Sequence, residues 1–190
     1  MKKNPALFLD RDGTLIKEKG YLCDPGELEL LPGVVEGLKA TQKMGFKLVV
    51  VSNQSGVARG LFPESQVLEI NLSLEKIFLE QGVEIDRFYY CPHHPRASIP
   101  AYRGLCTCRK PRPGQVYRAK RELGLDLSRS FLIGDKISDV ETARAAKVKS
   151  ILLLTGAKSR YEKIPPVYHL PDFVARNFWE SIEWIKKVYA

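Results

Sequence analysis

Two aspartates near the start of the chain have the spacing of a reactive pair. Asp10 and Asp12 directly follow the apolar run of residues 6–9, and Gly13 and Thr14 come after them. Side chains two positions apart on an extended segment point the same way, so we expect both carboxylates to face one cleft. Neighbouring carboxylates repel each other unless a cation or a proton lies between them. The pair therefore indicates a divalent metal ion or one protonated carboxyl group.

Further residues extend this pair toward phosphoryl-transfer chemistry. Asp135 follows another apolar run and offers a third oxygen ligand, with Asp139 one helical turn later as its expected support. Oxygen ligands without a nearby histidine favour Mg²⁺. Ser52 ends an apolar run, where its hydroxyl group and the following amides suit phosphate oxygens, and Lys110 can neutralise charge on a transferring phosphoryl group. Each residue alone is more often structural, so the prediction depends on the complete set.

A cysteine–histidine cluster lies between these motifs. Its four members have metal-ligand spacing: Cys91, His93, Cys106 and Cys108. Three thiolates and one imidazole would complete a tetrahedral Zn²⁺ shell with no place for water, so this metal would be structural. The alternative is three reduced cysteines and a loop histidine, and His94 is a second candidate ligand. Zinc in this loop, at about 91–108, would brace the segment that carries Arg109 and Lys110.

The composition is that of an ordinary globular protein. The 190 residues are 44% hydrophobic and 27% charged, which predicts one domain over 1–190 with a sizeable core. The net charge of +8 is compatible with a nucleic acid, with a phosphorylated small molecule or with a solvated basic surface, and the scattered acidic residues favour the last. No apolar run suits a signal peptide or a membrane span, so we expect a cytoplasmic protein.

Strands and helices are expected to alternate along the chain. Short apolar runs predict strands over 6–9, 47–52, 86–91, 130–133 and 149–154. Helical spacing of apolar residues predicts helices over 34–44, 63–81, 113–123, 138–146 and 179–189. This order predicts a doubly wound α/β fold with a mainly parallel sheet. Ligands of such folds bind at the carboxyl ends of the strands, which is where the polar residues above lie.

Four segments resemble the ordered motifs of the haloacid dehalogenase (HAD) superfamily. They are DRDGT at 10–14, VVVSNQSG at 49–56, CRKPRPG at 108–114 and IGDKISD at 133–139. Within that superfamily the chain resembles the D-glycero-D-manno-heptose 1,7-bisphosphate phosphatases of lipopolysaccharide and S-layer sugar synthesis. Histidinol-phosphate phosphatases are close relatives, but their zinc loop is shorter. The loop at residues 95–105 of this chain has the length found in the heptose bisphosphate enzymes. The resemblance extends from about 6 to 154 and implies a capless HAD-like fold.

The resemblance also implies a role for each motif residue. Asp10 would attack phosphorus and form an aspartyl-phosphate, which makes the chain a phosphoric monoester hydrolase. Asp12 would protonate the leaving oxygen and then deprotonate the attacking water. Mg²⁺ would bind to Asp10, Asp135 and the backbone carbonyl of Asp12, while Ser52 and Lys110 would bind the phosphoryl group. For Zn²⁺, the family pattern favours His93 over His94.

Substrate recognition is expected to come from loops, because the intervals between the motifs leave no room for a separate cap domain. The candidate substrate-binding residues are Arg11, Glu18, Lys19, Gly20, Tyr21, Asn53, Gln54, Ser55, Arg59, Arg109 and Lys136. Of these, Arg59, Arg109 and Lys136 are candidates for a second phosphate, although Arg59 and Lys136 fit surface charges equally well.

The expected partner is a small phosphorylated sugar, hydrolysed at its 7-phosphate by a monomeric enzyme without a membrane or nucleic-acid partner. Histidinol phosphate or another small phosphomonoester is the alternative within the same chemistry. A polynucleotide 3′-phosphatase or a zinc-braced nucleic-acid binder is the alternative from another class, suggested by the basic charge. The sequence lacks the interleaved basic and aromatic residues that stack bases, which argues against this last reading.

Overall fold

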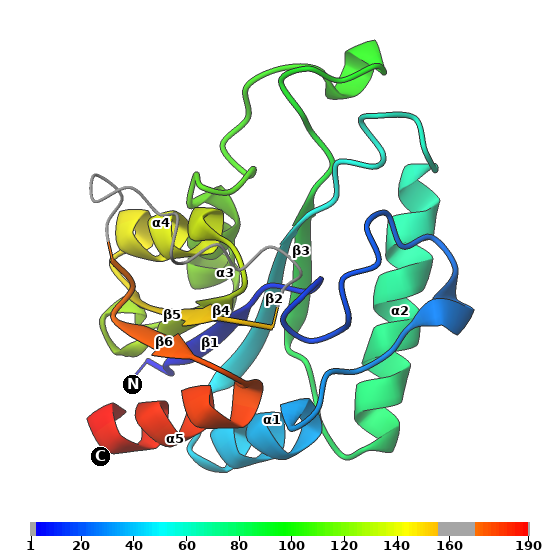
Figure 1. Cartoon of the computed structure of the whole chain (residues 1–190). Coiled ribbons are helices and arrows are strands. Elements are labelled where there is room, and N and C mark those ends of the chain that lie inside the picture. The colour runs from blue at the N-terminus through cyan, green and yellow to red at the C-terminus, as the bar shows by residue number, and fades with distance from the viewer. Residues whose placement is uncertain (1–2, 156–169, 190) are drawn as a thin grey trace.

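A six-stranded parallel sheet with helices on both faces forms the molecule (Figure 1). The computed structural model describes residues 3–155 and 170–189. In the order in which they lie in the sheet, the strands are β3 (Arg87–Cys91), β2 (Lys47–Asn53), β1 (Ala6–Leu9), β4 (Phe131–Gly134), β5 (Lys149–Leu153) and β6 (Phe173–Ala175). The helices are α1 (Val34–Lys43), α2 (Glu64–Glu80), α3 (Gly114–Leu123), α4 (Ile137–Ala146) and α5 (Phe178–Tyr189).

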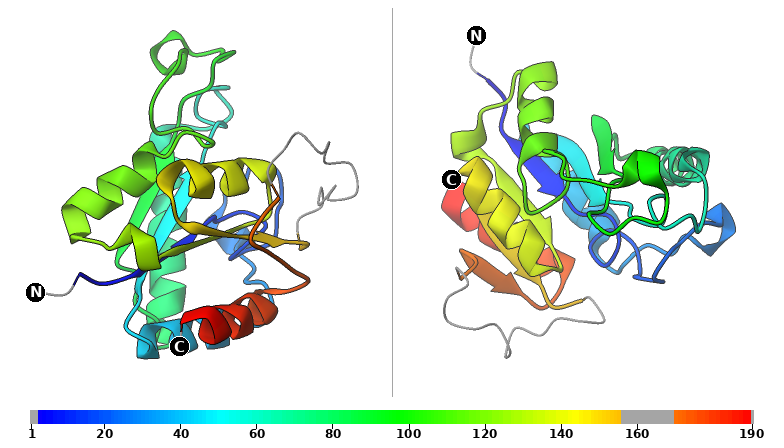
Figure 2. Two further views of the ribbon diagram at one scale, coloured as in Figure 1. Left: turned by 90° about the vertical axis from the view of Figure 1, so that its left-hand side faces the viewer. Right: turned by 90° about the horizontal axis from the view of Figure 1, so that it is seen from above.

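The buried side chains form two clusters, one on each face of the sheet. Leu7 and Leu9 of β1 join residues of α1, α2 and α5, whereas Ala6 and Phe8 join residues of α3 and α4. Successive residues of a strand point to opposite faces, so an apolar run without polar interruption is what a strand covered on both sides requires. The predicted doubly wound α/β class is therefore confirmed, and Figure 2 shows both helix layers.

The predicted strand and helix boundaries lie within one residue of the observed ones. The strand that the sequence did not predict is β6, which pairs in parallel with β5 at the edge of the sheet. It has three residues, of which only Ala175 is buried. So short an edge strand carries too little of the alternating pattern to be recognised.

In helix α2, the spacing of the apolar residues determines which side chains are buried. Its 17 residues bury Val67, Ile70, Leu74 and Phe78, as the helical spacing predicts, and the last three pack in one core cluster with residues of β1 and β2. Across residues 3–155 and 170–189, no helix has both the length and the apolar character needed to cross a bilayer.

The carboxyl ends of the central strands bring the sequence motifs together. Leu9 of β1 lies in register with Val50 of β2 on one side and with Ile133 of β4 on the other. The chain order reverses at β1, since β2 and β3 lie on one side and β4 to β6 on the other. Such a reversal is where open α/β sheets bind ligands. The segment after β3, residues 92–108, extends above this edge (Figure 1).

Candidate active site

Lys110 and Asp10 form a buried ion pair at the end of β1. The Lys110 Nζ atom lies 2.7 Å from Asp10 Oδ1 and 2.6 Å from Asp139 Oδ1, and it donates a 2.9 Å hydrogen bond to the Val51 carbonyl. Burial alone would raise the pKa of Asp10, but the charges of Lys110 and Lys136 outweigh it and lower that pKa. Asp10 is therefore an ionised carboxylate, as a nucleophile must be.

Asp139 forms an ion pair with Lys110, and its carboxylate also lies within 4.8 Å of those of Asp10 and Asp135. Besides its contact with Lys110, its Oδ2 atom accepts a 3.1 Å bond from the backbone N–H of Lys136, at the start of α4. Burial, only partly offset by Lys110, raises the pKa of Asp139 to about 6. Gly134 allows this close packing, since a Cβ atom there would lie 2.3 Å from the Asp139 carboxyl carbon.

The predicted magnesium ligands converge on one point, which the ammonium group of Lys136 approaches. Its Nζ atom lies 3.3 Å from the Asp12 carbonyl oxygen, 3.3 Å from Asp135 Oδ1 and 3.9 Å from Asp10 Oδ2. Burial and the neighbouring Asp10 charge raise the pKa of Asp135 to about 7. The three oxygens come from two carboxylates and one carbonyl. This set fits Mg²⁺, which prefers one or two carboxylates and hard oxygen ligands.

Gly13 makes this convergence possible. It has a φ of +87°, and a Cβ atom at this position would lie 2.4 Å from Asp135 Oδ2. Only glycine adopts such a backbone conformation without strain, and only glycine leaves room for the carboxylate. The Gly13 carbonyl in turn accepts a 2.8 Å hydrogen bond from the Thr155 hydroxyl after β5.

Asp12 is oriented by two side chains. Arg11 donates to both of its carboxylate oxygens, over 3.1 and 3.2 Å, and Gln54 donates a 2.8 Å bond to Oδ2. Arg11 itself is buried and also bonds to Asn71 of α2 at 3.0 Å. The structure therefore places Arg11, a predicted substrate-binding residue, behind Asp12 and outside the cavity.

The end of β2 is linked to the segment Cys108–Lys110 by two side-chain amides. Asn53 accepts from the Lys110 N–H at 3.0 Å and donates to the Lys110 carbonyl at 3.1 Å. Gln115 accepts from the Ser52 N–H at 3.0 Å and donates to the Ser52 and Cys108 carbonyls at 3.0 and 2.8 Å. Ser52 and Lys110, the expected phosphoryl-binding residues, are thereby fixed relative to each other.

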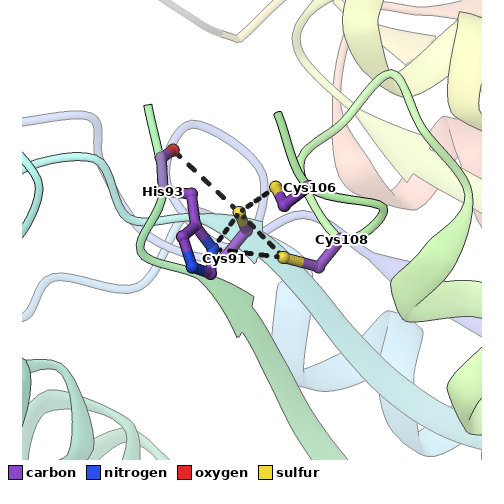
Figure 3. A group of neighbouring side chains, drawn as sticks. All are labelled: Cys91, His93, Cys106 and Cys108. Atoms are coloured by element: carbon purple, nitrogen blue, oxygen red, sulfur yellow. Dashed lines mark hydrogen bonds between the residues drawn. The ribbon is translucent and has the colours of Figure 1, made fainter. Parts of the chain in front are cut away.

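The four predicted zinc ligands lie together at the base of the loop that follows β3 (Figure 3). Cys91 Sγ lies 3.1 Å from Cys108 Sγ, 3.5 Å from Cys106 Sγ and 3.7 Å from His93 Nδ1. Sulfurs bound tetrahedrally to one zinc ion at about 2.3 Å would be about 3.8 Å apart, so the cluster fits Zn²⁺ after a slight expansion.

One thiol of this cluster has thiolate character. Hydrogen bonding with Cys91 lowers the pKa of Cys108 to about 5, while hydrogen bonding with Cys108 and burial raise the pKa of Cys91. The neighbouring His94 accepts a hydrogen bond from the Arg96 N–H through Nδ1. His93, as the sequence pattern favoured, is the histidine that faces the three sulfurs.

A cavity of about 600 Å³ opens above Asp10, Asp12, Lys110 and Asp135. It is lined by Asp10, Asp12, Glu18, Gly20, Tyr21, Asn53, Gln54, Ser55, Arg109, Lys110, Asp135, Lys136 and Ser138. Most of the predicted substrate-binding residues are therefore brought together. Lys19 instead contacts the Glu27 carbonyl and Glu29, while the Arg59 guanidinium lies 5.9 Å from the Tyr21 ring centre at the edge of the site.

Two features of the site were not predicted as such from the sequence. Gln115 is 3% exposed and belongs to no motif with a recognised chemistry. Ser138 lines the cavity within the segment IGDKISD, so its position in that motif was the available signal.

Comparisons with known proteins agree with this geometry. A HAD-hydrolase-like family model matches residues 107–181. The chain is 44% identical over 153 residues to the D-glycero-β-D-manno-heptose-1,7-bisphosphate 7-phosphatase of Photorhabdus laumondii, covering 80% of this chain and 81% of that one. It is 38% identical over 186 residues to the enzyme of that name from Escherichia coli K12, covering 98% and 96%.

Solved structures share the fold over nearly the whole chain. A HAD-like phosphatase from Mesorhizobium loti superimposes with a TM-score of 0.83 at 31% identity, covering 98% of this chain and 87% of that one. The D,D-heptose 1,7-bisphosphate phosphatase of B. bronchiseptica, complexed with magnesium and phosphate, has a TM-score of 0.81 at 26% identity and covers 97% and 99%. The chain belongs to the D-glycero-D-manno-heptose 1,7-bisphosphate 7-phosphatase family of the HAD superfamily.

Proposed function

We propose that this protein removes the 7-phosphate of D-glycero-β-D-manno-heptose 1,7-bisphosphate and leaves the 1-phosphate in place. The observation that carries the proposal is the buried Lys110–Asp10 ion pair beneath a cavity lined with charged groups. It combines an ionised nucleophile with a cation placed to bind the phosphoryl group that the nucleophile attacks. The named relatives supply the sugar and the anomer.

In the first step, an Asp10 oxygen attacks phosphorus and the bond from phosphorus to the sugar oxygen breaks. Asp12 gives its proton to that leaving oxygen, and Asp10 becomes an aspartyl-phosphate. Lys110, already 2.7 Å from Asp10, remains beside the transferred group and balances its charge. Magnesium, bound by Asp10, Asp135 and the Asp12 carbonyl, would supply further positive charge at the phosphoryl oxygens.

In the second step, water attacks the phosphorus of the aspartyl-phosphate. Asp12 takes a proton from this water, the bond between phosphorus and Asp10 breaks, and inorganic phosphate leaves with both aspartates restored. Gln54 and Arg11, with bonds of 2.8 to 3.2 Å in the structure, orient the Asp12 side chain that releases a proton in the first step and takes one up in the second. A positioned acid–base group of this kind contributes about 10²–10⁴-fold to the rate.

Of the remaining cations of the cavity, Arg109 suits the second phosphate of the substrate. It lines the cavity and is oriented by a 3.0 Å bond to the His93 carbonyl. Lys136 also lines the cavity, but its Nζ atom lies 3.3 Å from Asp135 Oδ1 and 3.9 Å from Asp10 Oδ2, at the end where the 7-phosphate reacts. Arg59 lies further out, beside Tyr21. We assign the 1-phosphate to Arg109 and place Arg59 at the rim.

Histidinol phosphate is the strongest alternative substrate, since it requires the same chemistry at phosphorus. It carries one phosphate and a positive charge, so cations at the far end of the cavity would repel it rather than bind it. A nucleic-acid 3′-phosphate is the alternative from another class. Among the residues that the structure describes, the cavity lining contains one aromatic side chain, Tyr21, which does not make a stacking surface for successive bases.

A panel of substrates with Mg²⁺ tests these alternatives. We expect the kcat/KM for the heptose 1,7-bisphosphate to exceed that for histidinol phosphate and for a 3′-phosphorylated oligonucleotide by more than about tenfold, which is about 1.4 kcal/mol of transition-state binding. Preference for either alternative would reject the sugar proposal. The β anomer is expected to be preferred over the α anomer.

We further propose that the enzyme works as a monomer in the cytoplasm. All four cysteines are free, and thiolate ligands for zinc require a reducing compartment. Light scattering coupled to gel filtration would test the monomer, and fractionation of the native host would test the location.

A further inference from the structure

We propose that Gln115 is a positioning residue that transmits the geometry of the cysteine–histidine cluster to Ser52. This inference rests on the proposed function, since it assigns Ser52 to the transferring phosphoryl group. Gln115 is the second residue of α3 and is 3% exposed, and it touches none of the reacting groups through its own hydrogen bonds.

The carboxamide of Gln115 pairs with the Ser52 peptide as a neighbouring strand would. It accepts from the Ser52 N–H and donates to the Ser52 carbonyl, each over 3.0 Å. Both backbone dihedrals of Ser52 are therefore constrained, and with them the direction of its hydroxyl group. Gln54 completes the arrangement with a 3.3 Å contact to that hydroxyl.

The second donor of Gln115 reaches the metal cluster. It donates a 2.8 Å bond to the carbonyl of Cys108, whose sulfur is 3.1 Å from Cys91 Sγ. One side chain thus joins Cys108, a predicted zinc ligand, to Ser52 near the end of β2, and every polar atom of its amide is used. A buried amide with all partners satisfied specifies one geometry, because any displacement leaves a polar group unpaired.

The start of α3 is packed to keep this link short. The Gly114 N–H donates a 3.0 Å bond to the Thr107 carbonyl, and a Cβ atom on Gly114 would lie 2.3 Å from that oxygen. A larger residue at 114 would push α3 away from the loop and lengthen both Gln115 contacts. The motif C-x-C at 106–108, followed by a glycine at 114, therefore places Gln115 between the cysteine loop and the end of β2.

The test is Gln115→Met, which keeps the volume and removes all three hydrogen bonds. The matched control is Gln66→Met in α2, because Gln66 is half-buried and its amide makes one hydrogen bond, to Glu69. We expect kcat to fall about ten- to a hundredfold, as small misplacements of positioned groups cause. The inhibition constant of inorganic phosphate should rise about tenfold. That constant does not depend on the active fraction of the enzyme, so a variant that is merely less stable would leave it unchanged.

A second readout follows the proposed contact directly. Hydrogen–deuterium exchange should increase in peptides that span 50–54 in Gln115→Met but not in those that span 149–153. Gln115→Glu retains the acceptor for the Ser52 N–H and loses both donors, so it should show the same kinetic defect. A phosphate inhibition constant within twofold of wild type in both variants would overturn the proposal, and so would failure of both variants to fold, which would indicate a purely structural role.

Failure of the proposal for Gln115 can be distinguished from failure of the substrate proposal. If the wild type hydrolyses p-nitrophenyl phosphate but not the heptose bisphosphate, the sugar assignment fails, and the role of Gln115 is still measured with the aryl ester and with phosphate inhibition. If the wild type hydrolyses the sugar and Gln115→Met does so equally well, only the present inference fails.

Discussion

Lys110 donates a 2.7 Å hydrogen bond to Asp10 although the two residues are 100 positions apart in the chain. The lysine is held in place by Asp139 and the Val51 carbonyl, so its position does not depend on Asp10 alone. The contacts of Lys110 therefore join the carboxyl ends of β1 and β2 to the first turn of α4. It also lets the catalytic and the structural roles of each partner be separated by mutation.

Asp10→Asn should abolish turnover and leave the fold intact. The amide is a poor nucleophile, and Asp139 still pairs with Lys110, so no buried charge is left alone. We expect kcat to fall by at least about 10³-fold, as loss of a covalent nucleophile does elsewhere. Steady-state kinetics and thermal unfolding measure the two effects. Asp24→Asn, on an exposed turn, is the control, and appreciable activity in Asp10→Asn would refute the nucleophile assignment.

Lys110→Met should destabilise the protein more at pH 8 than at pH 5. Without the ammonium group, Asp10 and Asp139 become two adjacent buried carboxyls, and breaking a buried pair costs about 3–5 kcal/mol. Their folded pKa values would rise above the unfolded ones, so folding would favour the protonated forms and stability would fall as pH rises. Urea unfolding at both pH values measures this.

The matched control for that variant is Lys47→Met, which removes a half-exposed ion pair with Asp86. An exposed pair of this kind contributes at most about 1 kcal/mol. Equal destabilisation by the two substitutions, or a loss that does not change with pH, would contradict the view that Lys110 compensates buried charge.

Magnesium should stabilise the protein more at alkaline than at acidic pH. The pKa of Asp135 is raised to about 7 by burial and by Asp10, so without metal its contribution to stability falls as pH rises from the unfolded value near 4 to about 7. Binding of Mg²⁺ to the ionised carboxylate offsets this loss of stability, but below pH 7 Mg²⁺ must first displace a proton from Asp135. The thermal midpoint with and without Mg²⁺, measured from pH 5.5 to 8.5, should diverge above pH 7. A shift independent of pH would exclude Asp135 as a ligand, and Asp24→Asn, at an exposed position, is the control.

The sequence predicted the site residues at the ends of the strands better than it predicted the contacts that hold them in place. Asp10, Ser52 and Asp135 follow or end apolar runs in a fixed order, and the parallel sheet necessarily brings such positions to one edge. That part of the site follows from topology. Arg11 was also predicted to contact substrate, yet its neighbour Asn71 lies 60 positions away on α2, where no local pattern marks a partner.

Gln115 shows why the rest required the structure. A glutamine near a helix start has no signature in sequence, because its role depends on the distance between α3, the end of β2 and the cysteine loop. The same applies to the ion pair between Asp139 and Lys110, which no local pattern marks. The packing permitted by Gly134 brings Asp139 to Lys110, in the same carboxylate cluster as Asp135.

Loss of the zinc site should impair catalysis through the position of Lys110 rather than through the chemistry itself. Cys108 is followed directly by Arg109 and Lys110, so Cys108→Ser should lower the zinc content from about one equivalent per chain and reduce kcat at saturating Mg²⁺. Cys23→Ser is the matched control, because Cys23 is exposed and outside the cluster. Metal analysis and kinetics on the same preparations measure both effects. If removal of the zinc left kcat unchanged, the loop would not position Lys110, and the two amide links from Asn53 and Gln115 would suffice to hold it against β2.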